Sequence, residues 1–313
     1  MMARSNLVGV VKGALRPLSQ LRWAADTALS RRLFGNTLKL RVNVEGFGRA
    51  LWTRQAFAAD LDPEVSAFYA EHAYYRPPVD LLPATLVTRL CERFSAALRD
   101  ASQVRSAYTD DEFYRQYKLP PSTERHLLTQ HVSDVHRSLP EIYEVFSPAV
   151  VRVIQSCFRS NFRVQSMAAW RMFALPPGLM TEPIIDRWHF DTGSTTRMRF
   201  LIPLTPMTRA NGATEMWDRS YTQFLIREGF TPISWGDPEG QNHAIEERYF
   251  KDNPRLVRNE GPAGQAILFN PSACLHHAGP RDPGQTRDMI QLDIRFARQL
   301  QIPSLDRPLA TGY

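Results

Sequence analysis

The sequence lacks any apolar run of 18 or more residues, so it predicts no membrane-spanning helix. Cysteine is also scarce. The chain of 313 residues has three, Cys91, Cys157 and Cys274, and they form no Cys-x-x-Cys pair. This pattern excludes a disulfide framework and a zinc ribbon, and a reducing, cytoplasmic setting is expected. Lysine-rich runs, zinc-finger spacing and basic-aromatic repeats are missing, so no nucleic-acid partner is expected.

The composition is that of a protein with a sizeable core. Hydrophobic residues make up 43% of the chain and aromatic residues 11%, which argues against wholesale disorder. The formal net charge is +6, a balance that suits anionic small molecules or a membrane surface. We expect a basic N-terminal arm or helix over residues 1–45, followed by one large domain over 46–313. Nothing in the sequence indicates an oligomeric state.

Residues 1–45 carry much of the positive charge, because they include many Arg and Lys residues and only two acidic residues, Asp26 and Glu45. Apolar residues recur there at spacings of three and four, as on one face of a helix that Pro17 interrupts. The apolar stretch before Lys12 is too short for a secretory signal. A basic arm, or a helix packed on the domain, is the favoured interpretation. An organelle transit segment or a peripheral membrane contact through residues 1–35 is the alternative.

The first part of the large domain, residues 46–160, is predicted to be mainly helical. Asp62-Pro63 and Ser147-Pro148 each place a capping residue before a proline at the first helical position. Leu86, Leu90 and Phe94 repeat every four residues, as on one helix face. The predicted helices begin at residue 63 and cover residues 83–98, 110–117, 124–139 and 148–158.

From residue 161 the period changes to that of strands, up to about residue 300. Residues 221–257, rich in Trp, Pro, Gly and charge, are interpreted as an insertion and a candidate lid. Several short strands after a helical half predict a mainly β fold with a double-stranded β-helix core, of the jelly-roll or cupin-like type, braced by the helices. The predicted strands cover residues 162–175, the region around His189, 197–204, 213–217, 266–269 and 288–296.

The stretch Trp188-His189-Phe190-Asp191 carries a metal-binding pattern. On an extended strand His189 and Asp191 point to the same face, so an imidazole and a carboxylate can bind one metal ion. A second histidine would complete a facial triad of two His and one carboxylate, which leaves positions open on Fe(II). His276 and His277 supply one candidate each, and because strand neighbours point to opposite sides, only one can bind that ion. Cys274 is interpreted as a small buried residue.

The last predicted strand follows Arg287, and its two faces differ. Ile290, Leu292 and Ile294 share one face, whereas Arg287 and Asp293 share the other. If Arg287 points into the barrel, much of the interior there is polar. Buried charge must be paired or bind a ligand, and Asp293 can pair with one arginine. The alternative is that these arginines lie at strand ends in solvent.

The motifs together resemble the phytanoyl-CoA dioxygenase-like family of iron- and 2-oxoglutarate-dependent oxygenases, over about residues 160–300. In that family, Trp-His-x-Asp is followed by Asn-Gly, a Gly-Asp-x-x-x-Phe strand, a distal His and an Arg. The matching positions are Trp188 to Asp191, Asn211-Gly212, Gly264 to Phe269, Leu275-His276 and Arg287. The departures are Gln265 in place of Asp, Asp218 to Tyr221 in place of Pro-Gly-Ser-His except for the Ser, and Arg281 where Asn is common.

The resemblance implies that His189, Asp191 and His276 bind Fe(II), and that Arg287 binds the far carboxylate of the cosubstrate 2-oxoglutarate. With O2 as the second cosubstrate, the family's chemistry converts 2-oxoglutarate to succinate and hydroxylates an unactivated C–H bond of a small molecule. Asp191 fills the position that halogenating relatives leave open for chloride. Desaturation and ring formation stay open. Relatives use fatty acyl thioesters, amino acids and secondary metabolites, so a small, anionic or acyl substrate is expected.

Two other functions fit the same ligand pattern. One is a non-catalytic jelly-roll binding protein with a vestigial metal site. The other is a zinc-dependent hydrolase that uses the same three ligands, although no Glu is placed as an obvious general base. Only the oxygenase needs Arg287, since a guanidinium binds a carboxylate bidentately. Iron-dependent release of succinate from 2-oxoglutarate would separate the three functions.

Overall fold

The structure of the chain is a computed structural model that describes residues 61–109, 127–175, 186–191, 197–230, 241–297 and 299–304. The predicted basic arm over residues 1–45 and the predicted helix over residues 110–117 lie outside this described part. Within it, no helix combines the length and the apolar character that crossing a membrane requires.

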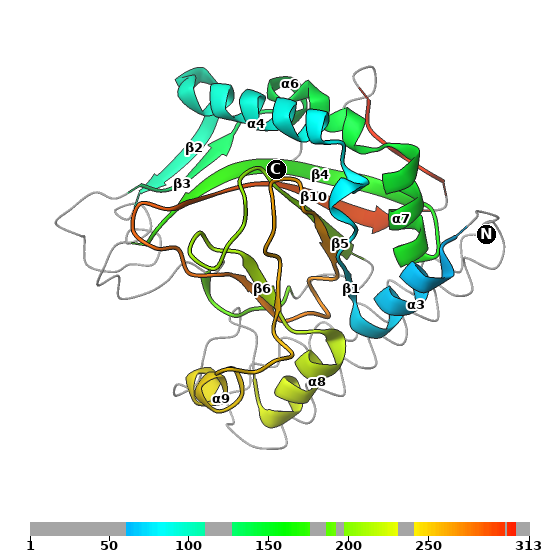
Figure 1. The fold of residues 1–313 in the computed structure, drawn as a ribbon, viewed down its shortest axis with the longest axis vertical. Coiled ribbons are helices and arrows are strands. Elements are labelled where there is room, and N and C mark those ends of the chain that lie inside the picture. Colours follow the sequence, from blue (N-terminus) through cyan, green and yellow to red (C-terminus); the bar gives the residue numbers. More distant parts are fainter. Residues whose placement is uncertain are drawn as a thin grey trace, which may run out of the picture.

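Two antiparallel sheets form the core (Figure 1). The larger has seven strands in the order β1-β8-β5-β10-β4-β3-β2, and the smaller has three in the order β7-β6-β9. The long strand β10 lies between β4 and β5, so the last strand of the chain joins the two that flank the metal motif. The strands are β1 (Tyr74–Tyr75), β2 (Val104–Thr109), β3 (Leu127–Val132), β4 (Phe162–Phe173), β5 (Arg197–Pro203), β6 (Thr214–Met216), β7 (Val257–Arg258), β8 (Ile267–Phe269), β9 (His276–Ala278) and β10 (Thr286–Phe296).

The helices fall into two groups (Figure 1). Helices from the first half of the chain cover the outer face of the larger sheet, whereas α8 and α9 lie on the far side, beyond β6. The first group comprises α3 (Pro63–His72), η1 (Val79–Leu81), α4 (Ala84–Arg99), η2 (Ala101–Gln103), α6 (Val135–Ser138), η3 (Pro140–Val145) and α7 (Pro148–Phe158). The second comprises α8 (Arg219–Glu228) and α9 (Gln241–Tyr249).

The two faces of β10 have different partners, as its alternating sequence predicts. Ile290 and Leu292 pack in one apolar cluster with Phe94 of α4. Met289 lies in a second cluster, between the sheets, together with Met172 of β4. Phe94 is 0% exposed, and burying such a side chain stabilises the fold by about 1.5–3 kcal/mol relative to leaving it in water. The outer face of the larger sheet is therefore covered by helices, and its inner face combines an apolar cluster with buried polar groups.

The capping signals of the sequence correspond to real helix starts. The side chain of Asp62 accepts hydrogen bonds from the backbone N–H groups of Glu64 and Val65, at the start of α3. Ser147 accepts one from Val150 at the start of α7. Each cap satisfies an N–H group that has no partner inside the helix.

The helix predicted over residues 124–139 is wrong for most of its described length. Residues 127–132 form β3, and only Val135–Ser138 is helical. Strand β2 adds a second correction to the mainly helical expectation for residues 46–160. Strand β3 pairs with the long strand β4, where Thr129 lies opposite Met172. Val132 is thereby buried in the cluster under the helices. Pairing with β4 thus outweighs the local helical pattern, since strand formation depends on context.

The predicted insertion over residues 221–257 is largely helical in its described part, because it contains most of α8 and all of α9. Asp218 caps α8 by accepting from the N–H of Tyr221. Tyr221 packs in an apolar cluster with Trp217 and Leu275, the residue before His276. The lid role stays a prediction. The whole is a mainly β jelly-roll core braced by helices, which confirms the fold class predicted from the sequence.

Candidate metal centre

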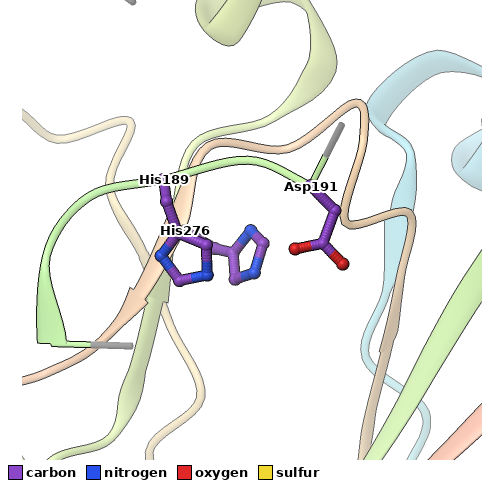
Figure 2. Close-up of side chains that lie close together, drawn as sticks. All are labelled: His189, Asp191 and His276. Carbon is purple, nitrogen blue, oxygen red and sulfur yellow. The ribbon is translucent and has the colours of Figure 1, made fainter. Parts of the chain in front are cut away.

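His189, Asp191 and His276 meet at one end of the space between the sheets (Figure 2). One ligand atom from each lies within 4.8 Å of the others. His189 and His276 form an antiparallel bridge, in which the N–H of each donates to the C=O of the other over 3.0 and 2.8 Å. The backbone N–H of Asp191 donates to Pro271 over 2.8 Å. Backbone pairing therefore fixes all three residues before any ligand binds.

Backbone carbonyls fix the tautomer of both histidines. Nδ1 of His189 lies 2.8 Å from the carbonyl oxygen of Arg187, and Nδ1 of His276 lies 2.9 Å from that of Cys274. A carbonyl only accepts, so each Nδ1 must donate, which leaves the lone pair on Nε2. Burial lowers the pKa of His189 and, more strongly, that of His276. Both rings are thus neutral, the form that binds a metal ion.

Two arginines from β5 orient the carboxylate of the cluster. Oδ2 of Asp191 accepts from Arg197 over 2.9 Å and from Arg199 over 2.8 Å. Arg199 also donates to Nε2 of His276 over 3.2 Å. Arg197 binds Asp293 of β10 through two hydrogen bonds, of 2.5 and 3.1 Å. Asp293 therefore pairs with an arginine in the interior, as the sequence suggested, and the two guanidinium groups are balanced by two carboxylates.

The neighbours His277 and Cys274 point away from the cluster. Nε2 of His277 lies 3.0 Å from Oε2 of Glu215, and Oε1 of Glu215 accepts from Arg258 over 2.6 Å. The thiol of Cys274 is fully buried and lies against the carbonyl oxygen of Ala73. Burial raises the pKa of Cys274 to about 12, so its thiolate is not formed at neutral pH. The structure therefore brings His276, and neither of these neighbours, to His189 and Asp191.

Arg287 is a buried cation on the inner face of β10, 3% exposed. Its Nη2 donates to the hydroxyl of Thr214 over 2.6 Å, and its Nη1 lies 3.6 Å from the sulfur of Met172. Its Nε atom has no hydrogen-bond partner. No acidic side chain of the described residues forms an ion pair with it, and Asp186, whose charge acts on it from farther away, is hydrogen-bonded to Arg281. Burial lowers its pKa to about 9. A buried guanidinium needs an anion, so the surroundings of Arg287 fit a carboxylate ligand.

Arg281 is another buried arginine, and it already forms an ion pair. Its Nη2 donates to Asp186 over 2.6 Å, and the two side chains are 1% and 6% exposed. Sequence reasoning missed this pair, and it also missed the contact of Arg287 with Thr214. Strand alternation could place Thr214 on an inner face, but no pattern along the chain shows which strand lies opposite β10.

The donor set fits a divalent transition metal. Two neutral imidazoles and one carboxylate, fixed by a jelly roll on one side of an ion, form the facial triad of the non-haem iron oxygenase class. The chain belongs to the phytanoyl-CoA dioxygenase family, whose sequence profile matches residues 75–289. This range includes the three residues of the cluster and Arg287, and it confirms the resemblance found in the sequence motifs.

Solved structures with a similar fold were compared with the chain. EctD from S. alaskensis with bound Fe matches at 13% identity and a TM-score of 0.50, over 82% of this chain and 84% of that chain. EctD with 2-oxoglutarate and 5-hydroxyectoine matches at 15% identity and a TM-score of 0.50, over 82% and 86%. SnoN, an epimerase from nogalamycin biosynthesis, matches at 12% identity and a TM-score of 0.49, over 75% and 82%. At these identities the likeness shows the fold alone. Among curated proteins, none matches the sequence.

Proposed function

We propose that the chain is an Fe(II)- and 2-oxoglutarate-dependent dioxygenase that hydroxylates an unactivated C–H bond of a small, anionic or acyl substrate. One observation carries the proposal. The jelly roll that gathers His189, Asp191 and His276 also buries Arg287, which forms no ion pair with an acidic side chain of the described residues. A metal site alone does not require such a cation, whereas a dicarboxylate cosubstrate does. EctD, which has this fold, has been crystallised with Fe and with 2-oxoglutarate.

Each residue has a role that its contacts support. Nε2 of His189 and of His276 would hold the iron together with the carboxylate of Asp191, which Arg197 and Arg199 orient. Arg287 would bind the far carboxylate of 2-oxoglutarate. Iron with 2-oxoglutarate and O2 supplies the oxidising power for hydroxylation, and succinate and CO2 are the coproducts. The anionic substrate class rests on the formal net charge of +6, a balance that suits anionic small molecules.

The contacts give less support to a zinc-dependent hydrolase. Such an enzyme needs a general base next to its metal-bound water. Of the acidic residues near the cluster, Asp293 is bound by Arg197, and Glu215 is bound by His277 and Arg258. Neither carboxylate is placed as a free base.

The test is iron-dependent release of succinate. Metal-free protein is reconstituted anaerobically with Fe(II) or with Zn(II), mixed with 2-oxoglutarate and a metabolite pool, and exposed to O2. We expect succinate from the iron-loaded protein only. Retention of iron without succinate from any pool would favour the vestigial binding protein. Zinc-dependent hydrolysis of a pool component without succinate would favour the hydrolase.

A further inference from the structure

The guanidinium of Arg199, in β5, reaches two of the three residues of the metal cluster. Its Nη1 donates to Nε2 of His276 over 3.2 Å, and its Nη2 donates to Oδ2 of Asp191 over 2.8 Å. A guanidinium is a planar, permanently charged fork that only donates hydrogen bonds. One side-chain cation therefore bridges an imidazole and a carboxylate that the same cluster offers to a metal ion.

The contact with His276 uses the lone pair that a metal ion needs. Nδ1 of His276 lies 2.9 Å from the carbonyl oxygen of Cys274 and donates to it, so Nε2 is the ring nitrogen that keeps a lone pair. The hydrogen bond from Arg199 occupies this lone pair. Because one lone pair cannot serve an N–H group and a metal ion together, a metal ion can bind His276 only after this hydrogen bond breaks.

Of the two partners, Arg199 is the one able to move. The backbone of His276 is paired with that of His189 over 3.0 and 2.8 Å, and the carbonyl of Cys274 holds the ring. The side chain of Arg199 is long and 17% exposed, so it can turn about its own bonds without a shift of the strand. Its hydrogen bond to Oδ2 of Asp191 can persist, since the second oxygen of the carboxylate can face a metal ion.

We propose that Arg199 substitutes for the metal ion in the metal-free protein. It holds Asp191 and His276 together as a positioning residue, and it withdraws from His276 when a metal ion binds. The inference rests on the metal-binding part of the proposed function and is independent of the reaction. The wild type then binds a metal ion less tightly than its three ligands allow, because each binding event breaks a charged hydrogen bond.

The first test measures the affinity of the metal-free full chain for Zn(II) by calorimetric titration. Arg199→Met removes the bridge and its charge, whereas Arg199→Lys keeps the charge but lacks the fork that spans both atoms. Both variants should bind Zn(II) on the order of tenfold more tightly, the scale of one hydrogen bond to a charged group. Arg197→Lys is the matched control. Arg197 donates to the same oxygen of Asp191 from the same strand, and this variant should bind no more tightly than the wild type.

The second test observes the hydrogen bond in the metal-free wild type by NMR. The protein is labelled with ¹⁵N-histidine, and the Nε2 resonance of His276 is assigned by its absence in His276→Ala. A ring nitrogen that accepts a hydrogen bond resonates upfield of one with a free lone pair. The His276 resonance should therefore lie upfield in the wild type and move downfield in Arg199→Met. A free-lone-pair position in the folded wild type would contradict the bridge without the use of any variant.

The outcomes separate this inference from the proposed function. If Arg199→Lys binds Zn(II) with wild-type affinity and only Arg199→Met gains, charge alone sets the affinity and the inference is wrong. Weaker binding by both Arg199 variants would also overturn it, because Arg199 would then support the bound metal. In both cases the wild type binds metal and the proposed function stands. If neither the wild type nor the Arg199 variants bind any metal, the inference and the proposed function are both wrong.

Discussion

At the scale of single residues, the adjacent histidines of β9 have opposite surroundings and should respond differently to substitution. His276→Ala removes an atom of the metal cluster, as do His189→Ala and Asp191→Ala, and each should abolish retention of Fe(II). His277→Ala should keep the metal, because His277 binds Glu215 on the other side. Calorimetric titration with Fe(II) under anaerobic conditions measures this. Loss of the metal in His277→Ala but not in His276→Ala would reverse the assignment.

Arg287 should matter for the cosubstrate and not for the metal. Arg287→Ala removes the only charge proposed for the far carboxylate, so 2-oxoglutarate binding should weaken by about 2–5 kcal/mol, the scale for truncating one partner of a buried charge pair. Lys should not restore it, since an ammonium lacks the planar fork. Arg295→Ala is the matched control, because Arg295 is on the same strand but binds Gln165 at an exposed end. Equal 2-oxoglutarate affinity in wild type and Arg287→Ala would make Arg287 structural.

His131 should make stability depend on pH. Burial, followed by the charge of Arg105, lowers its pKa from 6.5 to about 4. Between about pH 6.5 and 4 the unfolded chain takes up a proton that the folded chain does not, so folding loses about 2–3 kcal/mol over that window. Above pH 6.5, His131 is neutral in both the folded and the unfolded state, so it adds no pH dependence to the free energy of unfolding. Urea unfolding of wild type and His131→Gln at each pH measures this, and identical slopes below pH 6.5 would contradict it.

At the scale of elements, the turn before β6 depends on Gly212. Its φ angle is +84°, and an added Cβ would lie 2.8 Å from the carbonyl oxygen of Gly279, just after β9. Gly212→Ala should therefore destabilise the fold by about 1–3 kcal/mol and weaken metal binding, because β9 carries His276. Gly284→Ala is the control. Gly284 has a φ angle of +80° but open space around it. Gly284→Ala therefore measures the cost of the positive φ angle alone, without a steric clash. Equal unfolding free energies for the two variants would remove the steric part of this account.

Elements with a strong period could be predicted from the sequence, and those defined by distant partners could not. The strands near residues 162–175, 197–204 and 288–296 follow from their alternation, because each has one face against the helices. Strand β3 was missed since its pairing partner, β4, lies some thirty residues further along the chain. The motif residues of the cluster were likewise visible in the sequence. The surroundings of Arg287 were not, because Thr214 and Met172 come from two other strands.

At the scale of the whole molecule, the two faces of the larger sheet bury different groups. The outer face is covered by the helices and holds fully buried residues such as Phe200 and Leu292. The inner face holds a second apolar cluster together with the Arg197–Asp293 pair and Arg287, and Arg197 also contacts Asp191 of the metal cluster. The apolar clusters on both faces stabilise the fold. That stability lets the inner face also keep groups that serve a ligand at a cost to the free protein.

This division predicts that removing the buried polar groups around Arg287 stabilises the free protein. In the double variant Arg287→Met with Thr214→Val, both partners of the 2.6 Å hydrogen bond become apolar, so no polar atom of that pair stays unsatisfied. The metal-free double variant should unfold at higher urea, with a gain of about 1–3 kcal/mol, because a buried cation that forms no ion pair among the described residues is replaced by packing.

Bound metal and 2-oxoglutarate should make the wild type more stable than the double variant. With Mn(II) and 2-oxoglutarate at about 100 times its dissociation constant, the wild type should gain about 2.7 kcal/mol from the cosubstrate by mass action. The double variant should gain only what Mn(II) alone provides, since it keeps His189, Asp191 and His276 and loses the site for the far carboxylate. Urea unfolding without ligands, with Mn(II) alone and with both separates these contributions. A metal-free double variant that is less stable than the wild type would show that Arg287 supports the fold, and the proposed cost of keeping an unpaired cation between the sheets would be wrong.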